Sequence, residues 1–106
     1  MPKYLVQASY NADGIRGLAN DSASGRRADV QAAVRAVGGK VEAFYYSFGD
    51  YDVVSVLELP NDVTAAALSL TIAAVGTVKI KTTPLLTVED VDKALDLQMK
   101  YRAPGE

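Results

Sequence analysis

The stretch from residue 44 to residue 58, FYYSFGDYDVVSVLE, constrains the fold more than any other part of the chain. Two runs of aromatic and β-branched residues flank Gly49 and Asp50, and a Gly-X pair suits a two-residue type II′ turn. The stretch therefore predicts a β-hairpin. Its two faces would carry different facing pairs: Phe48 with Tyr51, Tyr46 with Val53, Phe44 with Ser55 and Glu42 with Leu57 on one, and Ser47 with Asp52, Tyr45 with Val54, Ala43 with Val56 and Val41 with Glu58 on the other.

Sequence patterns on either side of the hairpin predict two further strands and a first helix. The apolar and polar residues alternate over Lys3–Tyr10 and again over Thr77–Thr83, as expected of strands. Residues 15 to 18 are compatible with a short helical turn, and Arg26–Val37 has the spacing of a helix. Gly38 and Gly39 follow that helix and are expected to end it.

Two more helices are predicted after the hairpin. The second follows Asn61 and Asp62, which supply its N-cap, and ends at Gly76; its expected buried stripe is Val63, Ala66, Ala67, Leu70 and Ala74. Leu68 and Ile72 lie off that stripe, so this helix is expected to be covered on two sides. The third begins near Thr87 and carries an apolar row of Val88, Val91, Leu95 and Met99, before a frayed tail at residues 103–106.

The resulting order is β-α-β-β-α-β with a terminal helix. This is the split-βαβ order of an α+β, ferredoxin-like fold, with four antiparallel strands and the helices on one face of the sheet. We find no linker, repeat or low-complexity segment, so residues 1–106 are predicted to form a single domain.

Such a sheet leaves its second face open. We assign the more aliphatic side of each strand to the helices: Val6, Ala8, Val41, Ala43, Val54, Val56, Val78 and Ile80. The open face would then hold the aromatic side of the hairpin together with Leu5, Gln7, Ser9, Val53, Ser55, Leu57, Lys79, Lys81 and Thr83. Apolar patches of that size mark interaction surfaces. A second copy of the chain, stacked sheet to sheet, is the simplest cover and would enclose a barrel-like interior.

Composition limits the chemistry. The chain of 106 residues has no cysteine, histidine or tryptophan, which removes thiolate nucleophiles and the commonest zinc ligands. We expect no metal and no cofactor. The net charge of −2 argues against nucleic acid and anionic membranes as partners. The amino terminus has no signal-peptide pattern and no apolar run approaches the ~18 residues of a membrane helix, so a cytoplasmic location is expected.

The segment Phe44–Val54 resembles the signature of the GYD domain family, whose Gly-x-Tyr-Asp motif is met by Gly49, Tyr51 and Asp52. The resemblance extends over residues 3 to 95, through the tyrosine-rich first strand, the segments Gly14-Ile15-Arg16 and Gly38-Gly39-Lys40, and the alanine-rich second helix. It implies a bacterial protein of the dimeric α+β barrel type and says little about activity. The histidines that several dimeric α+β barrel enzymes use have no counterpart here.

Ten residues are candidates for function, and no catalytic residue is assigned. The candidate ligand contacts are Tyr46, Tyr51, Asp52, Lys79, Lys81 and Arg16, where the lysines would bind an anion and the tyrosines would bind through hydrogen bonds. The candidate dimer contacts are Phe44, Phe48, Val53 and Leu57. Each has a structural alternative: Asp52 as a cap for backbone N–H groups, the tyrosines as interface anchors, and the lysines as protection of an edge strand.

Two functions remain open from sequence. The first is a binding or assembly domain that associates with itself and takes up a small anionic or aromatic molecule. The alternative is a cofactor-independent enzyme, similar to a monooxygenase or an isomerase, with Asp52 or Glu42 as its base. An RNA-binding module of the same element order is disfavoured, because the third strand lacks the expected aromatic motif.

Overall fold

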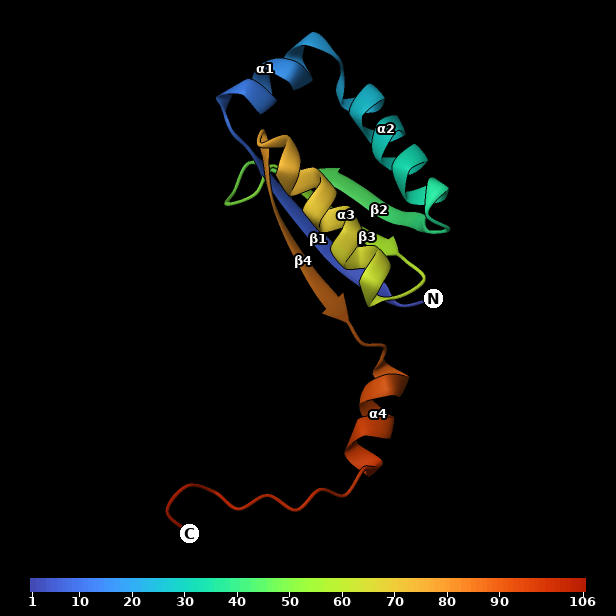
Figure 1. Cartoon of the computed structure of the whole chain (residues 1–106), viewed down its shortest axis with the longest axis vertical. Coiled ribbons are helices and arrows are strands. Elements are labelled where there is room, and N and C mark those ends of the chain that lie inside the picture. The colour runs from blue at the N-terminus through green and yellow to red at the C-terminus, as the bar shows by residue number, and fades with distance from the viewer.

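The computed structural model describes all residues, 1–106, and shows one antiparallel sheet with helices on one of its faces (Figure 1). The element order is β1 (Lys3–Tyr10), α1 (Ala12–Asn20), α2 (Ala23–Ala36), β2 (Lys40–Tyr46), β3 (Val53–Glu58), α3 (Asp62–Val75), β4 (Val78–Leu85) and α4 (Val88–Asp96). The strands lie in the order β2-β3-β1-β4, and every neighbouring pair is antiparallel. The ferredoxin-like α+β fold predicted from the sequence is therefore confirmed. None of the helices is long and apolar enough to cross a membrane.

Side-chain caps set where the first two helices begin. The Asn11 side chain accepts a hydrogen bond from the Gly14 N–H at 2.9 Å, which starts α1. This helix has nine residues, whereas the sequence predicted only a short turn. Ser22 accepts from the Gly25 N–H at 2.9 Å, so α2 begins three residues before the predicted Arg26. It ends at Ala36, and Gly38 follows with a left-handed φ of 82°.

The loop of the hairpin is wider than predicted. The strands end at Tyr46 and resume at Val53, and the Ser47 N–H donates to the Asp52 carbonyl at 2.8 Å. Gly49 does not have a positive φ, so the predicted type II′ turn is wrong. The reason is that Asp52 is bound to β1: its N–H donates to the Ala8 carbonyl at 2.8 Å, which draws the chain away from a tight turn.

The register of the hairpin survives this change. Phe44 pairs with Ser55, Tyr46 with Val53, and Tyr45 with Val54, as the sequence predicted, because the six-residue loop 47–52 has the same centre as the predicted two-residue turn. At the end of the hairpin away from the loop the register differs from the prediction, because a β-bulge between Val41 and Ala43 leaves Glu42 unpaired. Val41 therefore pairs with Leu57 and Lys40 pairs with Glu58, one residue away from the predicted partners.

The face assignment of the hairpin is wrong for residues 43–46 and 53–57, although that of Val41 and of strands β1 and β4 is confirmed. The core consists of Tyr4, Val6, Val34, Leu57, Leu59 and Ala65, with Val30, Val41, Leu68 and Ile80 packed against it. Val6 pairs with Ser55 and Tyr4 pairs with Leu57, so Ser55 and Leu57 point towards the helices. Phe44, Tyr46 and Val53 are on the same side by register, while Ala43, Val54 and Val56 point away from the helices. Both sides of the hairpin are apolar, so alternation alone did not decide which was inside.

Helix α3 also turns a different side to the sheet than predicted. Its whole predicted buried stripe is exposed: Val63, Ala66, Ala67, Leu70 and Ala74. Ala65 is buried instead, and Leu68 and Ile72 face inwards. A hydrogen bond of 2.6 Å between the Ser69 and Thr82 hydroxyls joins α3 to β4 and fixes this rotation.

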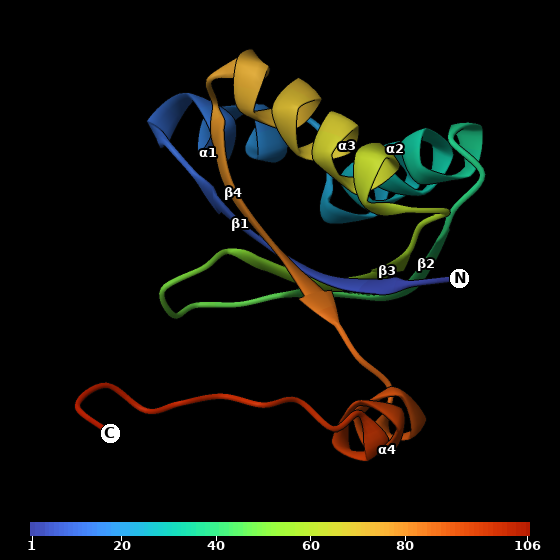
Figure 2. The ribbon, with the colours of Figure 1, turned by 60° about the horizontal axis from the view of Figure 1, so that its bottom comes forward.

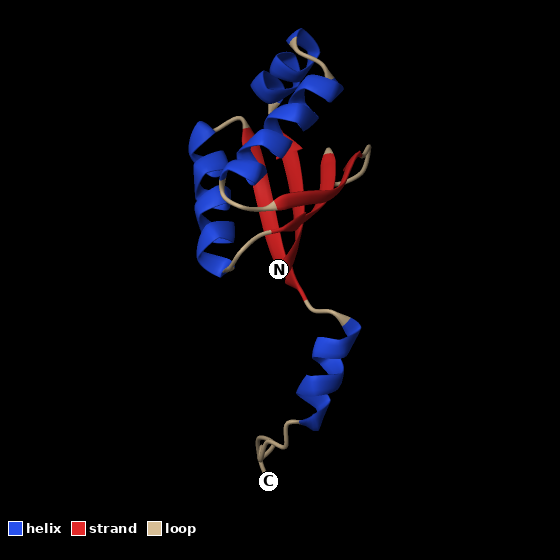
Figure 3. Ribbon diagram, turned by 90° about the vertical axis from the view of Figure 1, so that its right-hand side faces the viewer, coloured by secondary structure: helices blue, strands red, loops and turns tan.

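The layers are clear in Figure 2, where α1, α2 and α3 lie on one side of the sheet and α4 lies on the other. Figure 3 shows α4 and the carboxyl terminus extending beyond the end of the sheet. Helix α4 ends at Asp96, so Met99 of the predicted apolar row lies beyond it. The fold thus has a compact body and a projecting carboxyl-terminal segment.

Candidate functional site

The face of the sheet turned away from the helices is one candidate surface, which we call the open face. Strand alternation and register place on it Leu5, Gln7, Ser9, Ala43, Tyr45, Val54, Val56, Lys79, Lys81 and Thr83. Its centre is aliphatic, and its β4 edge carries two exposed lysines. Lys3 and Glu42 form an ion pair of 2.9 Å on the same face, and the hydrogen bond that Lys3 donates to the Glu42 carboxylate raises the pKa of Lys3.

A second candidate is the apolar cleft between the sheet and the helices α2 and α3. It has a volume of about 200 Å3. Phe44, Val53 and Leu57 line it from the sheet, whereas Ala33 and Leu68 are among the residues that line it from the helices. The inner sides of these helices are short of large side chains, so they do not fill the space above the sheet.

Polar groups in the cleft are few, and those of Ser55, Arg26 and Asp29 have partners. The Ser55 hydroxyl donates to the Val6 carbonyl at 3.0 Å within the buried sheet. Arg26 donates to Asp29 on the same helix at 3.2 Å, and both line the cleft. The cleft therefore suits an apolar molecule with little polar demand.

The predicted ligand residues of the hairpin are engaged in structural contacts. The Tyr46 hydroxyl donates to the Ala23 carbonyl at the start of α2, at 3.0 Å. Its ring meets that of Phe44 edge to face at 5.5 Å, and partial burial raises the pKa of Tyr46. The Asp52 carboxylate accepts from the Tyr10 N–H at 2.8 Å, and Tyr51 lies in the loop beside it.

The three predicted basic contacts are not brought together with these residues. Lys79 and Lys81 point from β4 on the open face, and Arg16 pairs with Asp13 on its own helix. Lys79 lines a groove of about 530 Å3 with Tyr10 and Asn11, whereas Tyr46 lines another of about 260 Å3. No single cavity contains all six residues, and their contact with a ligand stays a prediction.

The predicted dimer contacts lie mostly inside the protomer. Val53 and Leu57 are buried under the helices and Phe44 is partly buried there, so they are not part of the open face. Phe48 alone is fully exposed, at the hairpin loop. The residues that the sequence assigned to the core, Val54 and Val56, take their place on the open face.

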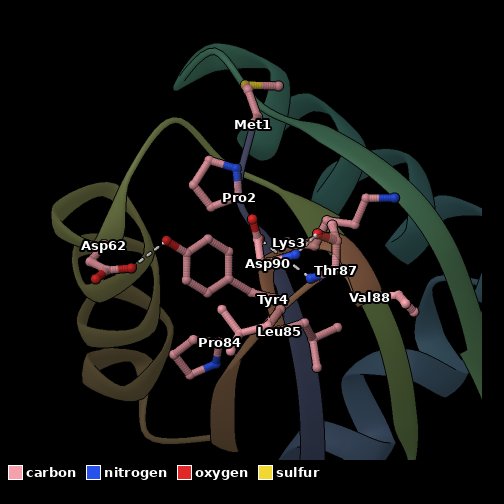
Figure 4. Close-up of a pocket in the computed structure, with 11 residues that line it drawn as sticks. Met1, Pro2, Lys3, Tyr4, Asp62, Pro84, Leu85, Thr87, Val88 and Asp90 are labelled. Carbon is pink, nitrogen blue, oxygen red and sulfur yellow. Dashed lines mark hydrogen bonds between the residues drawn. The ribbon is translucent and has the colours of Figure 1, made fainter. Parts of the chain in front are cut away.

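A groove at the root of the carboxyl-terminal segment has no counterpart in the sequence predictions. Its volume is about 790 Å3, and it lies between the amino terminus, the start of α3 and the chain after β4. Figure 4 shows the Tyr4 ring at its centre, with the hydroxyl directed at Asp62. That hydroxyl donates to the Asp62 carboxylate at 2.5 Å. The bond and burial of the ring together raise the pKa of Tyr4 to about 12.

Comparison with known proteins identifies the family. A family model described as GYD domain matches residues 4–95. The chain belongs to the GYD domain family. A relative from Thermus thermophilus, the glutamine synthetase and cystathionine beta-lyase binding protein, is 31% identical over 91 residues, which are 86% of this chain and 95% of the relative. No solved structure matches the chain.

In this GYD protein, Asp52 of the family signature holds the hairpin to β1. Its backbone N–H and its carboxylate both bind that strand. The Tyr4–Asp62 pair was missed because its members lie 58 residues apart and neither has an unusual sequence context. The only hint was Asp62 itself, an acid in the first turn of α3, where the helix dipole favours a carboxylate.

We expect Tyr4→Phe to make this GYD protein less sensitive to alkaline unfolding. The folded-state pKa of Tyr4 is raised, so the wild-type hydroxyl contributes stability below pH ~10 and loses it as the pH rises towards 12. The variant lacks the hydroxyl and therefore the hydrogen bond to Asp62. Its free energy of unfolding at pH 7 should be about 1 kcal/mol lower for that reason. Urea unfolding between pH 7 and pH 11.5 measures both effects. Equal pH profiles for the two proteins would contradict the expectation.

Proposed function

We propose that this protein is a binding module that docks onto an enzyme. The observation that carries the proposal is the similarity to the Thermus relative, which extends over most of both chains. That relative is named for binding glutamine synthetase and cystathionine beta-lyase. A docking function needs an exposed apolar surface with a defined shape. Helix α3 offers one, because it is apolar on both sides while the protomer covers only one of them.

The outer side of α3 is the surface that we propose meets the enzyme. Its residues recur at the helical spacing i, i+3, i+4, i+7 and i+11, which is the pattern of a buried helix face. Val63 is 78% exposed and Leu70 is 71% exposed, with alanines between them. The two large side chains would act as anchors, and the alanines would let a partner element approach the helix closely. Leaving such a stripe in water forgoes the free energy of burying it.

Purified glutamine synthetase and cystathionine β-lyase from the source organism test this proposal. We expect at least one to bind the full chain by isothermal titration calorimetry, and Leu70→Ser to weaken that binding by about 30-fold, as an anchor residue should. Val37→Ser removes a comparably sized exposed side chain from the end of α2 and should leave affinity unchanged. Failure of both enzymes to bind at tens of micromolar would end the proposal. If Leu70→Ser binds with unchanged affinity, the outer side of α3 is not the surface that contacts the enzyme.

We also propose that the module is a homodimer formed through the open face. Leu5, Val54 and Val56 supply the aliphatic centre of that face, which a second sheet would remove from water. The cytoplasmic location and bacterial origin expected from the sequence belong to the same proposal. So does the division of the chain into a single domain, residues 1–106.

A second proposed function is the uptake of a small apolar molecule in the cleft beneath α2 and α3. The observation that favours it is the apolar lining together with the satisfied polar groups Ser55, Arg26 and Asp29. Among the sequence-predicted residues, those in the lining are Phe44, Val53 and Leu57. Filling the cleft would stabilise the fold, so thermal-shift screening with apolar and aromatic compounds tests it.

A further inference from the structure

The chain after β4 projects from the body as an arm, which we define as residues 86–106. Every residue of α4 is exposed, and the helix forms no packed interface with another helix or strand (Figure 1). The helix is nevertheless well specified. The Thr87 hydroxyl accepts from the Asp90 N–H at 3.0 Å, and the Asp90 carboxylate accepts from the Thr87 N–H at 3.4 Å.

A helix in this situation needs a partner. An isolated helix shorter than about 12 residues is marginal in water, and α4 has nine. The arm also carries large apolar side chains that nothing in the protomer covers. Leu95 is 77% exposed and Met99 is 86% exposed, and the others are Leu86, Val88, Val91, Leu97 and Tyr101. Their burial against another molecule would supply the stability that the helix lacks alone.

The dimensions of the chain point the same way. The radius of gyration is 17.1 Å, whereas a compact chain of this length has about 13 Å. The accessible surface is 7606 Å2, which exceeds the surface of a compact monomer of this mass by roughly 1,900 Å2. A standard protein interface buries about 800 Å2 on each partner. The protomer therefore has enough surplus surface for a large permanent interface.

Two observations identify a second copy of the chain as that partner. First, α4 lies on the open-face side of the sheet (Figure 2), which is the side on which a second sheet would stack. Second, the charges are complementary. Helix α4 has four carboxylates and one lysine, whereas the open-face edge of β4 presents Lys79 and Lys81.

We propose that the arm of one copy lies across the β4 edge of a second copy, and that the exchange is reciprocal. The apolar side of α4, with Val91 and Leu95, packs on the second copy, and the α4 carboxylates face its Lys79 and Lys81. In a two-fold dimer each contact occurs twice, so the arm of each copy binds the β4 edge of the other. This inference rests on the proposed self-association and adds the element that secures it.

Sedimentation velocity of the full chain tests the arm. We expect a dimer for the wild type, and for Leu95→Ser a dimer dissociation constant raised by about 30-fold. Leu95 is exposed and α4 packs on no other element, so the variant should keep the circular dichroism of the body. Lys93→Ser lies on the opposite side of α4 and is the matched control, with no more than about a twofold change expected.

Charge reversal locates the contact. Lys79→Glu with Lys81→Glu should weaken the dimer, as should Asp92→Lys with Asp96→Lys, and a chain carrying all four changes should recover most of the affinity. Both losses should shrink as salt increases. If the fourfold variant is as weak as either pair, the arm does not lie along β4.

The outcomes separate the two levels of the proposal. A wild-type chain that stays monomeric at tens of micromolar ends both the proposed self-association and the arm exchange. A dimer that Leu95→Ser leaves unchanged overturns only the arm. If Leu95→Ser weakens binding of the enzyme and leaves the dimer intact, the arm is a docking segment for that enzyme and the exchange is again overturned.

Discussion

Replacing Leu57 by alanine should lower the free energy of unfolding by about 2–5 kcal/mol. The side chain is 1% exposed and belongs to the core with Tyr4 and Leu59. This core has only six members, so the loss of one large side chain is a substantial part of a stability that is typically 5–15 kcal/mol. Urea unfolding followed by circular dichroism measures the change, and we expect the variant to be partly unfolded at 37 °C.

The neighbouring substitution Val56→Ala is the matched control. Val56 points to the open face, so its loss should cost the protomer less than about 1 kcal/mol and act mainly on self-association. The loss in Leu57→Ala should not depend on protein concentration, whereas that in Val56→Ala should. The opposite pattern would mean that Leu57 lies at a dimer interface, as the sequence-based face assignment had suggested, and would contradict the observed face assignment.

This pair of residues shows where sequence reasoning succeeds and where it stops. The hairpin register was predictable because Gly49 and Asp50 mark the centre of the loop, although not its turn type, and every pairing from Ala43 to Tyr46 follows from that centre. The choice of face was not predictable, because both sides of the hairpin carry apolar side chains that could be buried. It depends on the pairing of Val6 with Ser55, a contact between distant parts of the chain.

The candidate site has the same limit. The sequence correctly suggested that Asp52 caps backbone N–H groups, since aspartate near a turn commonly does so. Beyond the acid in the first turn of α3, it gave no sign of the Tyr4–Asp62 bond, which exists only because β1 lies beside the start of α3. For α3, the periodic stripe of Val63 and Leu70 indicated burial, and the protomer leaves it exposed. That disagreement is informative, because a pattern typical of burial on an exposed face is what a docking surface requires.

Gly39→Ala should be the second severe substitution, with a loss of about 1–3 kcal/mol in the free energy of unfolding. A Cβ at this position would lie 2.5 Å from the Glu58 carbonyl oxygen and 2.9 Å from the Val34 side chain. The carbonyl cannot retreat easily, because Glu58 is paired with strands on both of its sides. Chemical denaturation measures the loss of stability. The N–H of residue 39, which donates to the Val34 carbonyl in the wild type, should also lose its protection against hydrogen exchange.

Gly38 is the control that separates crowding from backbone conformation. It has a φ of 82°, and the nearest atom to an added Cβ is 3.6 Å away, so only its left-handed conformation is costly. Gly38→Ala should therefore cost about 1–2 kcal/mol, and Gly38→Asn less, because asparagine tolerates that conformation. At Gly39 the order should reverse, since asparagine adds bulk to a site without room. If Asn and Ala rank the same way at both positions, close packing at Gly39 is not what requires glycine there.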